Sequence, residues 1–138
     1  MDKNRFIKSQ DCWMDTVIAE LKNGEKKSHW IWFVLPQLKG LGNSFTSEYY
    51  GLESLDDARE YYSNKYLRKN LNKCLHIIYK YKDIRALVYC LGSLDTLKLR
   101  SCVSLFYLAT KKKMFKKILD KFFDGLIDEK TVILLEKR

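Results

Sequence analysis

The side chains best suited to chemistry lie in the segment Lys26-Lys27-Ser28-His29-Trp30-Ile31-Trp32-Phe33-Val34-Leu35-Pro36-Gln37. It holds two of the three tryptophans, one of the two histidines and the only proline. Ammonium groups bind anions, an indole can stack on a planar base, and an imidazole exchanges a proton near neutral pH. This combination favours a pocket for an anionic ligand that has a planar part.

A second polar group interrupts an otherwise apolar stretch further along the chain. Lys98, Arg100 and Ser101 follow Asp95 among leucine, valine and phenylalanine residues. A cation that is buried needs an anionic partner. The sequence leaves three partners open, namely Asp95, Glu20 or an anion bound from outside.

We expect the two stretches to meet across one pocket. The phosphate would be contacted by four cations, Lys26, Lys27, Lys98 and Arg100. Ser44 and Ser101 would donate hydrogen bonds, and His29 and Gln37 would contact the edge of the ligand. Trp30 or Trp32 would pack its planar part together with Tyr50. The predicted ligand-binding residues are Lys26, Lys27, His29, Trp30, Trp32, Gln37, Ser44, Tyr50, Asp95, Lys98, Arg100 and Ser101.

These residues favour a module that binds a phosphate-bearing, nucleotide-derived small molecule, such as an ADP-ribose-like compound or a cyclic nucleotide. Such a module would sense or sequester a signalling nucleotide. The alternative is a hydrolase or transferase in which His29 acts as general acid or base, with Asp95 or Glu20 fixing its tautomer. Against this alternative, a lone histidine beside tryptophans is more often a core residue bonded to a backbone carbonyl.

A third hypothesis concerns the lysines between Lys111 and Lys121, which follow the spacing of a solvated helix face. Such a face could bind nucleic acid or an acidic protein. The formal net charge of +9 supports a polyanionic partner. However, lysine greatly outnumbers arginine, so an AT-rich genome explains the excess equally well.

Several classes of site have no sequence motif in this chain. Zinc-protease, Walker A, dinucleotide-binding and nucleophile-elbow patterns are all missing, so neither a metal nor a cofactor is predicted. The cysteines Cys12, Cys74, Cys90 and Cys102 form no C-x-x-C pair and lie among apolar neighbours. We therefore expect four buried free thiols.

The length of 138 residues and the 46% hydrophobic content predict one folded domain over 1–138. No apolar run reaches the ~20 residues that span a bilayer, and the N-terminus lacks a secretory signal. These features predict a cytoplasmic protein without a membrane partner, and they are compatible with a homo-oligomer.

Hydrophobic periodicity predicts an all-α multihelical bundle with one long structured loop. Residues 26–35 are predicted to form a buried helix, with a buried strand as the weaker alternative, and 37–53 form the loop. Asp95 and Asp128 are expected to cap helices. The other predicted helices cover 5–23, 54–62, about 66–81, 83–91, 96–110, 111 to about 123, and 128–135.

The chain also resembles a known bacterial family, DUF1810, a domain of unknown function. The H-W-x-W-x-x-x-P-Q core from His29 to Gln37 is its most specific feature. The other matching residues are Glu20-Leu21, Gly24, Lys26-Lys27-Ser28, Gly40-Leu41-Gly42, Ser44, Tyr50, Ser54-Leu55, Ala58, Gly92, Asp95, Lys98-Leu99-Arg100-Ser101, Ser104-Leu105-Phe106, Leu119, Phe123, Gly125, Asp128 and Thr131. The resemblance implies a compact multihelical fold and no particular activity.

Overall fold

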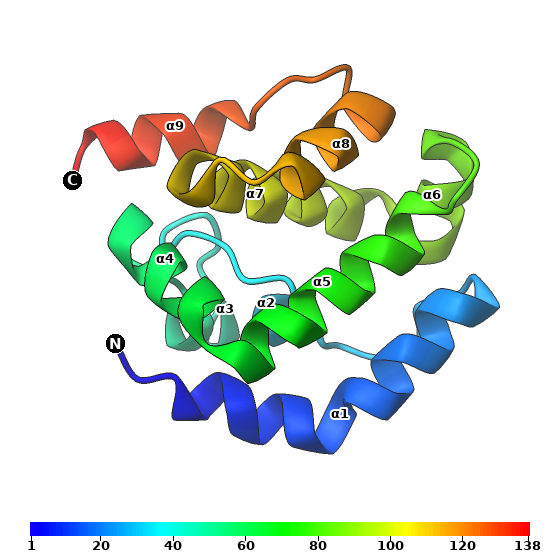
Figure 1. Cartoon of the computed structure of the whole chain (residues 1–138), viewed down its shortest axis with the longest axis horizontal. Helices are drawn as coiled ribbons and strands as arrows, with labels where there is room; N and C mark the ends of the chain where they lie inside the picture. The colour runs from blue at the N-terminus through cyan, green and yellow to red at the C-terminus, as the bar shows by residue number, and fades with distance from the viewer.

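A computed structural model describes residues 1–138 and contains nine α-helices and no strand, which confirms the predicted all-α class (Figure 1). The helices are α1 (Asn4–Asn23), α2 (Ile31–Val34), α3 (Phe45–Tyr50), α4 (Leu55–Ser63), α5 (Lys65–Tyr79), α6 (Ile84–Leu91), α7 (Ser93–Thr110), α8 (Lys113–Phe122) and α9 (Glu129–Glu136).

Helix α7 lies at the centre and packs against α4, α6, α8 and α9 (Figure 1). It is buried around most of its circumference because its sequence is apolar on several faces at once. Phe106 shows this packing, since its ring lies 5.5 Å from the ring of Tyr61 and 5.6 Å from that of Phe115. The buried apolar side chains of the molecule form one continuous core.

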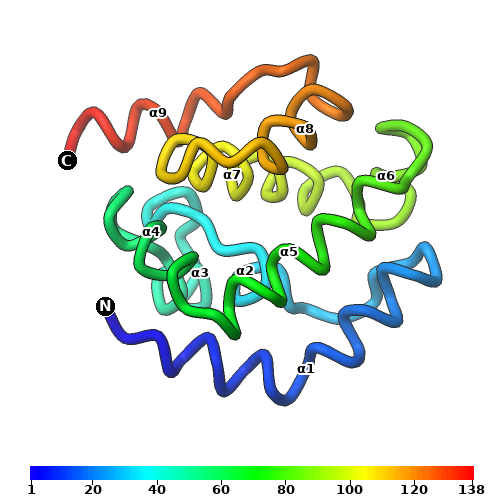
Figure 2. Tube along the Cα trace, in the orientation of Figure 1, coloured from blue at the N-terminus to red at the C-terminus, as the bar shows by residue number.

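Helix α1 closes the opposite side of the molecule by packing on α5 and α2 (Figure 2). The fully buried Gln10 joins these elements. Its amide nitrogen donates to the Phe33 carbonyl at 2.7 Å and to the Tyr61 hydroxyl at 2.9 Å, and its oxygen accepts from Asn70 at 2.9 Å. Every polar atom of this amide is therefore used within the core.

The prediction of one buried helix over 26–35 was wrong, because only Ile31–Val34 is helical. The backbone N–H of Lys26 donates to the Cys90 carbonyl at 2.8 Å, and those of Lys27 and Ser28 donate to the Glu20 carboxylate. Tertiary partners thus take up donors that a helix would have left free in its first turn.

The predicted loop over 37–53 is correct except at α3, where Ser44 caps a short helix by accepting from the Ser47 N–H at 3.1 Å. The loop returns to its start through a parallel bridge between Leu38 and Leu52. Tube and ribbon views both place this segment between α1 and α7 (Figure 2).

Asp128 caps α9 as predicted, by accepting from the Thr131 N–H at 3.1 Å. The same prediction for Asp95 was wrong, because α7 begins at Ser93 and Gly92 is its N-cap. Gly92 has a φ of 86°, a left-handed value that favours glycine, and this allows the sharp turn from α6 into α7. Asp95 consequently lies in the first turn of α7 with its carboxylate free for a tertiary contact.

Three of the four cysteines are buried free thiols, and burial raises the pKa of Cys74 to about 12. The prediction was wrong for Cys12, which is exposed because it lies on the solvent side of α1. No helix combines the length and the apolar character that a bilayer-spanning segment requires.

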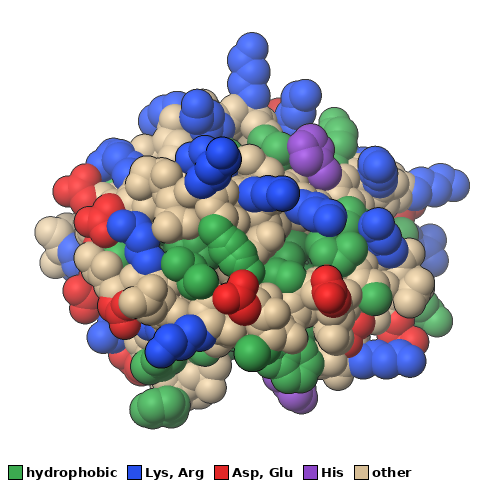
Figure 3. Space-filling view, turned by 60° about the horizontal axis from the view of Figure 1, so that its bottom comes forward, with side chains coloured by type: hydrophobic (Ala, Val, Ile, Leu, Met, Phe, Trp, Pro, Cys, Tyr) green, Lys and Arg blue, Asp and Glu red, His purple; other side chains and the backbone are tan.

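Charged side chains are unevenly distributed over the surface. Figure 3 brings the α1 side of the molecule forward, and Lys and Arg gather in the upper half, on the side of α5. Asp and Glu are more frequent in the middle and at the lower left of that view.

Gly51 provides a test of the packing of the loop. A Cβ at this position would lie 2.6 Å from the Cβ and 2.7 Å from the Cα of Lys39, so the backbone beside the Leu38–Leu52 bridge would have to move. We expect Gly51→Ala to lower the free energy of unfolding by about 1–3 kcal/mol in urea denaturation. Asn43→Ala, at an exposed position in the same loop, should change it by less than about 0.5 kcal/mol. Equal stability of the two variants would contradict this packing.

Candidate functional site

The Glu20 carboxylate, near the end of α1, organises the segment that precedes α2. Its Oε1 accepts from the backbone N–H groups of Lys27 at 3.1 Å and Ser28 at 3.2 Å, and from the Trp30 indole at 2.8 Å. Its Oε2 accepts from the Ser28 hydroxyl at 2.6 Å. Four donors therefore converge on one buried side chain and fix the path of residues 27–30.

These contacts also set the charge of Glu20. Burial raises the pKa of the Glu20 carboxyl, but hydrogen bonds from Ser28, Trp30 and the Lys27 N–H together outweigh burial and leave the pKa below its ordinary value of 4.5. The carboxylate is thus ionised at neutral pH and acts as an acceptor only.

Lys26 and Lys98 meet at Asp95. The Lys26 ammonium lies 2.8 Å from Asp95 Oδ2, and the Lys98 ammonium lies 3.4 Å from Asp95 Oδ1. Lys26 also donates to the Ser28 carbonyl at 2.5 Å and lies 4.8 Å from the centroid of the Trp30 ring. Its side chain is only 6% exposed, so these neighbours supply the anionic and polar surroundings that a buried cation requires.

Two adjoining hollows open on either side of His29, and together they form what we call the groove. One has a volume of 390 Å³ and lies against the start of α7, and the other has a volume of 300 Å³ and lies against Trp32. Lys26, His29 and Asp95 line both hollows. Both hollows are open to solvent, and their volumes lie at the lower end of the range for small-molecule sites.

Lys98, Trp32 and Lys27 are side chains of the groove that solvent can reach. Lys98 is 33% exposed, and its ammonium lies 5.3 Å from the centroid of the half-buried Trp32 ring. The Lys27 side chain is 72% exposed and lies 3.8 Å from Glu25, so it is largely free in solvent.

His29 is exposed at the junction of the two hollows and is therefore not the buried core histidine that such a context usually indicates. The alternative required Asp95 or Glu20 to fix its tautomer. Both carboxylates have other partners, because Asp95 pairs with two lysines and Glu20 accepts from the segment after α1. The structure therefore shows no carboxylate–histidine pair.

Arg100 and Ser101, both predicted to lie in the pocket, are on another side of α7. Arg100 donates to the carbonyls of Leu126 at 2.9 Å and Ile127 at 3.1 Å, and Ser101 donates to Asp128 at 3.1 Å. Successive residues of a helix are turned by about 100°. Arg100 is therefore directed away from Lys98 and instead holds the connection between α8 and α9.

Four more predicted residues have structural roles. Trp30 is fully buried, Ser44 caps α3, and the Tyr50 hydroxyl lies 2.6 Å from the Ser9 hydroxyl. Gln37 is buried, with its amide nitrogen unpartnered and its backbone carbonyl bonded to Leu52.

Conversely, Thr46, Ser93 and Leu94 line the groove although their sequence context carries no signal for it. Thr46 lies on the short helix α3, which the glycine-rich context concealed, and the two others begin α7 earlier than predicted.

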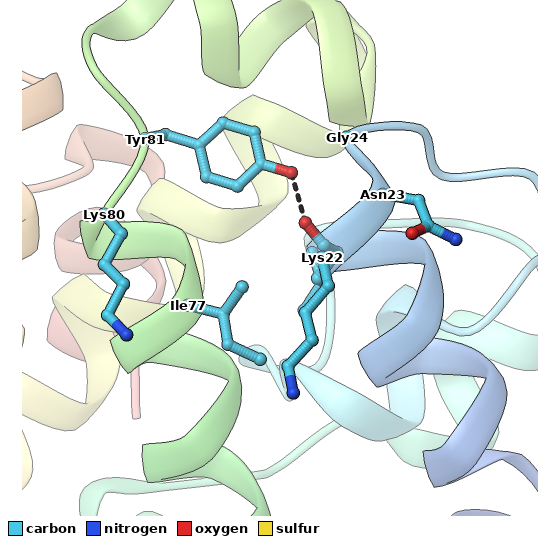
Figure 4. A pocket seen from close by; sticks show the side chains of 7 residues that line it. Lys22, Asn23, Gly24, Ile77, Lys80 and Tyr81 are labelled. Carbon is cyan, nitrogen blue, oxygen red and sulfur yellow. Dashed lines mark hydrogen bonds between the residues drawn. The ribbon is translucent and has the colours of Figure 1, made fainter.

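A separate hollow of 420 Å³ lies between the ends of α1 and α5 (Figure 4). Lys22 and Lys80 flank it, and Ile77 and Tyr81 form its apolar part. The Tyr81 hydroxyl donates to the Leu21 carbonyl and lies 3.2 Å from the Cys90 sulfur. This hollow shares no residue with the groove.

The chain matches the family described as Protein of unknown function (DUF1810) over residues 1–135. It belongs to this family. The crystal structure of the conserved hypothetical protein Rv1873 from Mycobacterium tuberculosis is similar, with 37% sequence identity and a TM-score of 0.92. The similarity covers 98% of this chain and 96% of that one. No curated protein matches the chain at a significant level.

Glu20 offers a pH-dependent test of the segment that shapes the groove in this DUF1810 protein. Replacement of Glu20 by Gln leaves some of the donors that converge on it without an acceptor. It should lower the free energy of unfolding by about 1–3 kcal/mol at pH 7. Because the folded-state pKa lies below 4.5, the stability from Glu20 is present above that pH and is lost as the pH falls through the folded value.

We therefore expect the difference in melting temperature between wild type and Glu20→Gln to shrink between pH 5 and acidic pH. Glu25→Gln, at an exposed position close by, is the matched control and should show little difference at any pH. A constant Glu20→Gln difference across this range would contradict the role assigned to the ionised carboxylate.

Proposed function

We propose that this protein binds a small, phosphate-bearing, nucleotide-derived ligand in the groove and thereby senses or sequesters it. The observation that carries the proposal is the meeting of Lys98, Trp32 and His29 at the two adjoining hollows. An ammonium, a half-buried indole and an imidazole are there accessible to solvent within one small surface.

The proposed phosphate contacts come from Lys98 and Lys27. Lys98 is the key cation because its 3.4 Å separation from Asp95 is longer than the 2.8 Å of the Lys26 pair, and its side chain is more exposed. A phosphate would compete with Asp95 for Lys98, while Lys26 would keep Asp95 neutralised. The exchange is favoured because a phosphate oxygen can form a short charge-assisted hydrogen bond with Lys98, whereas the present contact with Asp95 is 3.4 Å long.

This assignment narrows the set of cations expected from the sequence. The Lys26 ammonium is already surrounded by Asp95, the Ser28 carbonyl and the Trp30 ring, so its role is to support the groove. Arg100 is bonded to the connection after α8 and takes no part in the proposed site.

The proposed contact for the planar part of the ligand is Trp32. Lys98 now lies over this ring, so its movement toward a phosphate would uncover the indole face. Thr46 and Phe33 line the same hollow and would border the bound ring. His29, between the hollows, would contact the part of the ligand that joins ring and phosphate.

Calorimetric titration with ADP-ribose, ADP and cyclic AMP tests the proposal. Wild type should bind at least one of them, and Lys98→Gln should weaken that binding by about 10-fold or more, since a charged hydrogen bond contributes about 1.5–3 kcal/mol. Arg100→Gln is the matched control, because it removes the same charge from the same helix outside the groove, and its affinity should change less than 2-fold.

Equal losses in the two variants, or no binding of any nucleotide by the wild type, would contradict the proposal. Mass spectrometry of small molecules released from the denatured protein, after purification from cells, extends the test to ligands outside this set. If wild type converts a bound ligand to a product and His29→Ala does not, the protein is an enzyme and the proposal of a binding module is wrong.

A further inference from the structure

Helix α5 carries a continuous row of basic side chains that is unrelated to the groove. Lys65, Lys69, Lys73, His76 and Lys80 follow one another at intervals of four, four, three and four residues, and all five are exposed. This spacing places them on one face of a helix. At 1.5 Å per residue the row extends over about 22 Å. We call it the α5 row.

The four lysines of the α5 row form no ion pair within the chain, and α5 contains no Asp or Glu. Acids lie on neighbouring helices instead, such as Asp56 and Asp57 in the first turn of α4, and Asp11 of α1, which accepts from the Tyr66 hydroxyl. A general excess of lysine would not by itself separate the two signs of charge in this way. Like charges four residues apart destabilise a helix, so a polyanion that neutralises them would also stabilise α5.

The basic surface continues on α8, which packs beside α5. Lys121 of α8 donates to the Tyr79 carbonyl at 2.5 Å and lies 4.8 Å from the centroid of the Tyr79 ring. Lys113 and Lys117 precede it at intervals of four residues and are exposed. At the same C-terminal end of α5, Lys80 borders the hollow that it shares with Lys22, so the basic surface extends toward α1 (Figure 4).

The side chains of this basic surface favour a duplex over a membrane or a single strand as the polyanionic partner. Tyr79 is its only large exposed hydrophobic side chain, and Lys121 lies over that ring. Insertion into a membrane requires an apolar face, and single-stranded nucleic acid is usually held by aromatic stacking. A straight row of lysines on a rigid helix instead matches the regularly charged backbone of a duplex. In Figure 3, Lys and Arg gather in the upper half of the view, on the α5 side of the molecule.

We propose that the α5 row, extended by the lysines of α8, binds the phosphate backbone of double-stranded nucleic acid without sequence preference. Lysine is suited to this task because it acts as a point charge and does not read base edges as arginine does. The surface lies apart from the groove, so the binding is independent of the proposed nucleotide ligand.

Fluorescence anisotropy with a labelled 24-base-pair duplex tests the proposal. If four lysines neutralise phosphates, an increase in salt from 50 to 200 mM should weaken binding by roughly 100-fold. Lys69→Gln combined with Lys73→Gln should weaken binding at least 10-fold and reduce the salt slope by about two. Lys130→Gln combined with Lys137→Gln, at the start and just after the end of α9, removes the same charge and should change the affinity less than 2-fold.

Equal effects of the two double variants would reduce the interaction to net charge and overturn the proposal. Absence of duplex binding at 50 mM salt, equally tight binding of a single strand, or displacement of the duplex by polyglutamate at equal charge would also overturn it. So would retention on phosphatidylserine vesicles that depends on Lys69 and Lys73. Lys98→Gln should bind the duplex like wild type, which separates this test from that of the groove.

Discussion

The ionised carboxylate of Glu20 is the interaction on which the local structure of the groove depends. Four donors from three residues of the following segment, Lys27, Ser28 and Trp30, converge on it. These bonds hold Trp30 in the core and leave His29 on the outside. They also set the position of Lys26, whose own N–H is fixed by the Cys90 carbonyl.

Cations in the apolar segments of this protein are balanced mainly by groups of the same chain. Lys26 is matched by Asp95, and Arg100 is matched by two carbonyls of the connection between α8 and α9. A cation in an apolar stretch of sequence therefore indicates a partner within the same chain. It indicates a ligand only if the cationic side chain is still exposed in the folded protein. Lys98 meets that second condition because it shares an anion that Lys26 already neutralises and lies over a half-buried indole.

The remaining positive charge is on the surface and is arranged by helix geometry. Lysines at intervals of three and four residues form a row on α5, which contains no Asp or Glu, and continue on α8, where Asp120 pairs with Lys116. The proposed groove and the basic surface thus use different cations. The two proposed sites share no side chain, so the two proposals do not compete for the same residues.

Local signals in the sequence determined the all-α class, the positions of most helices and several of their ends. Ser54 and Asp128 cap helices through contacts three residues away, and Gly24 ends α1 with a φ of 80°, so neighbours along the chain suffice. Only the tertiary structure decided which cations have partners within the chain, because the contacts of Lys26 with Asp95 and of Arg100 with Leu126 join distant parts of the chain. Hydrophobic periodicity shows that such a side chain lies in an apolar element, but the packing of the helices determines whether a carboxylate, a carbonyl or solvent faces it.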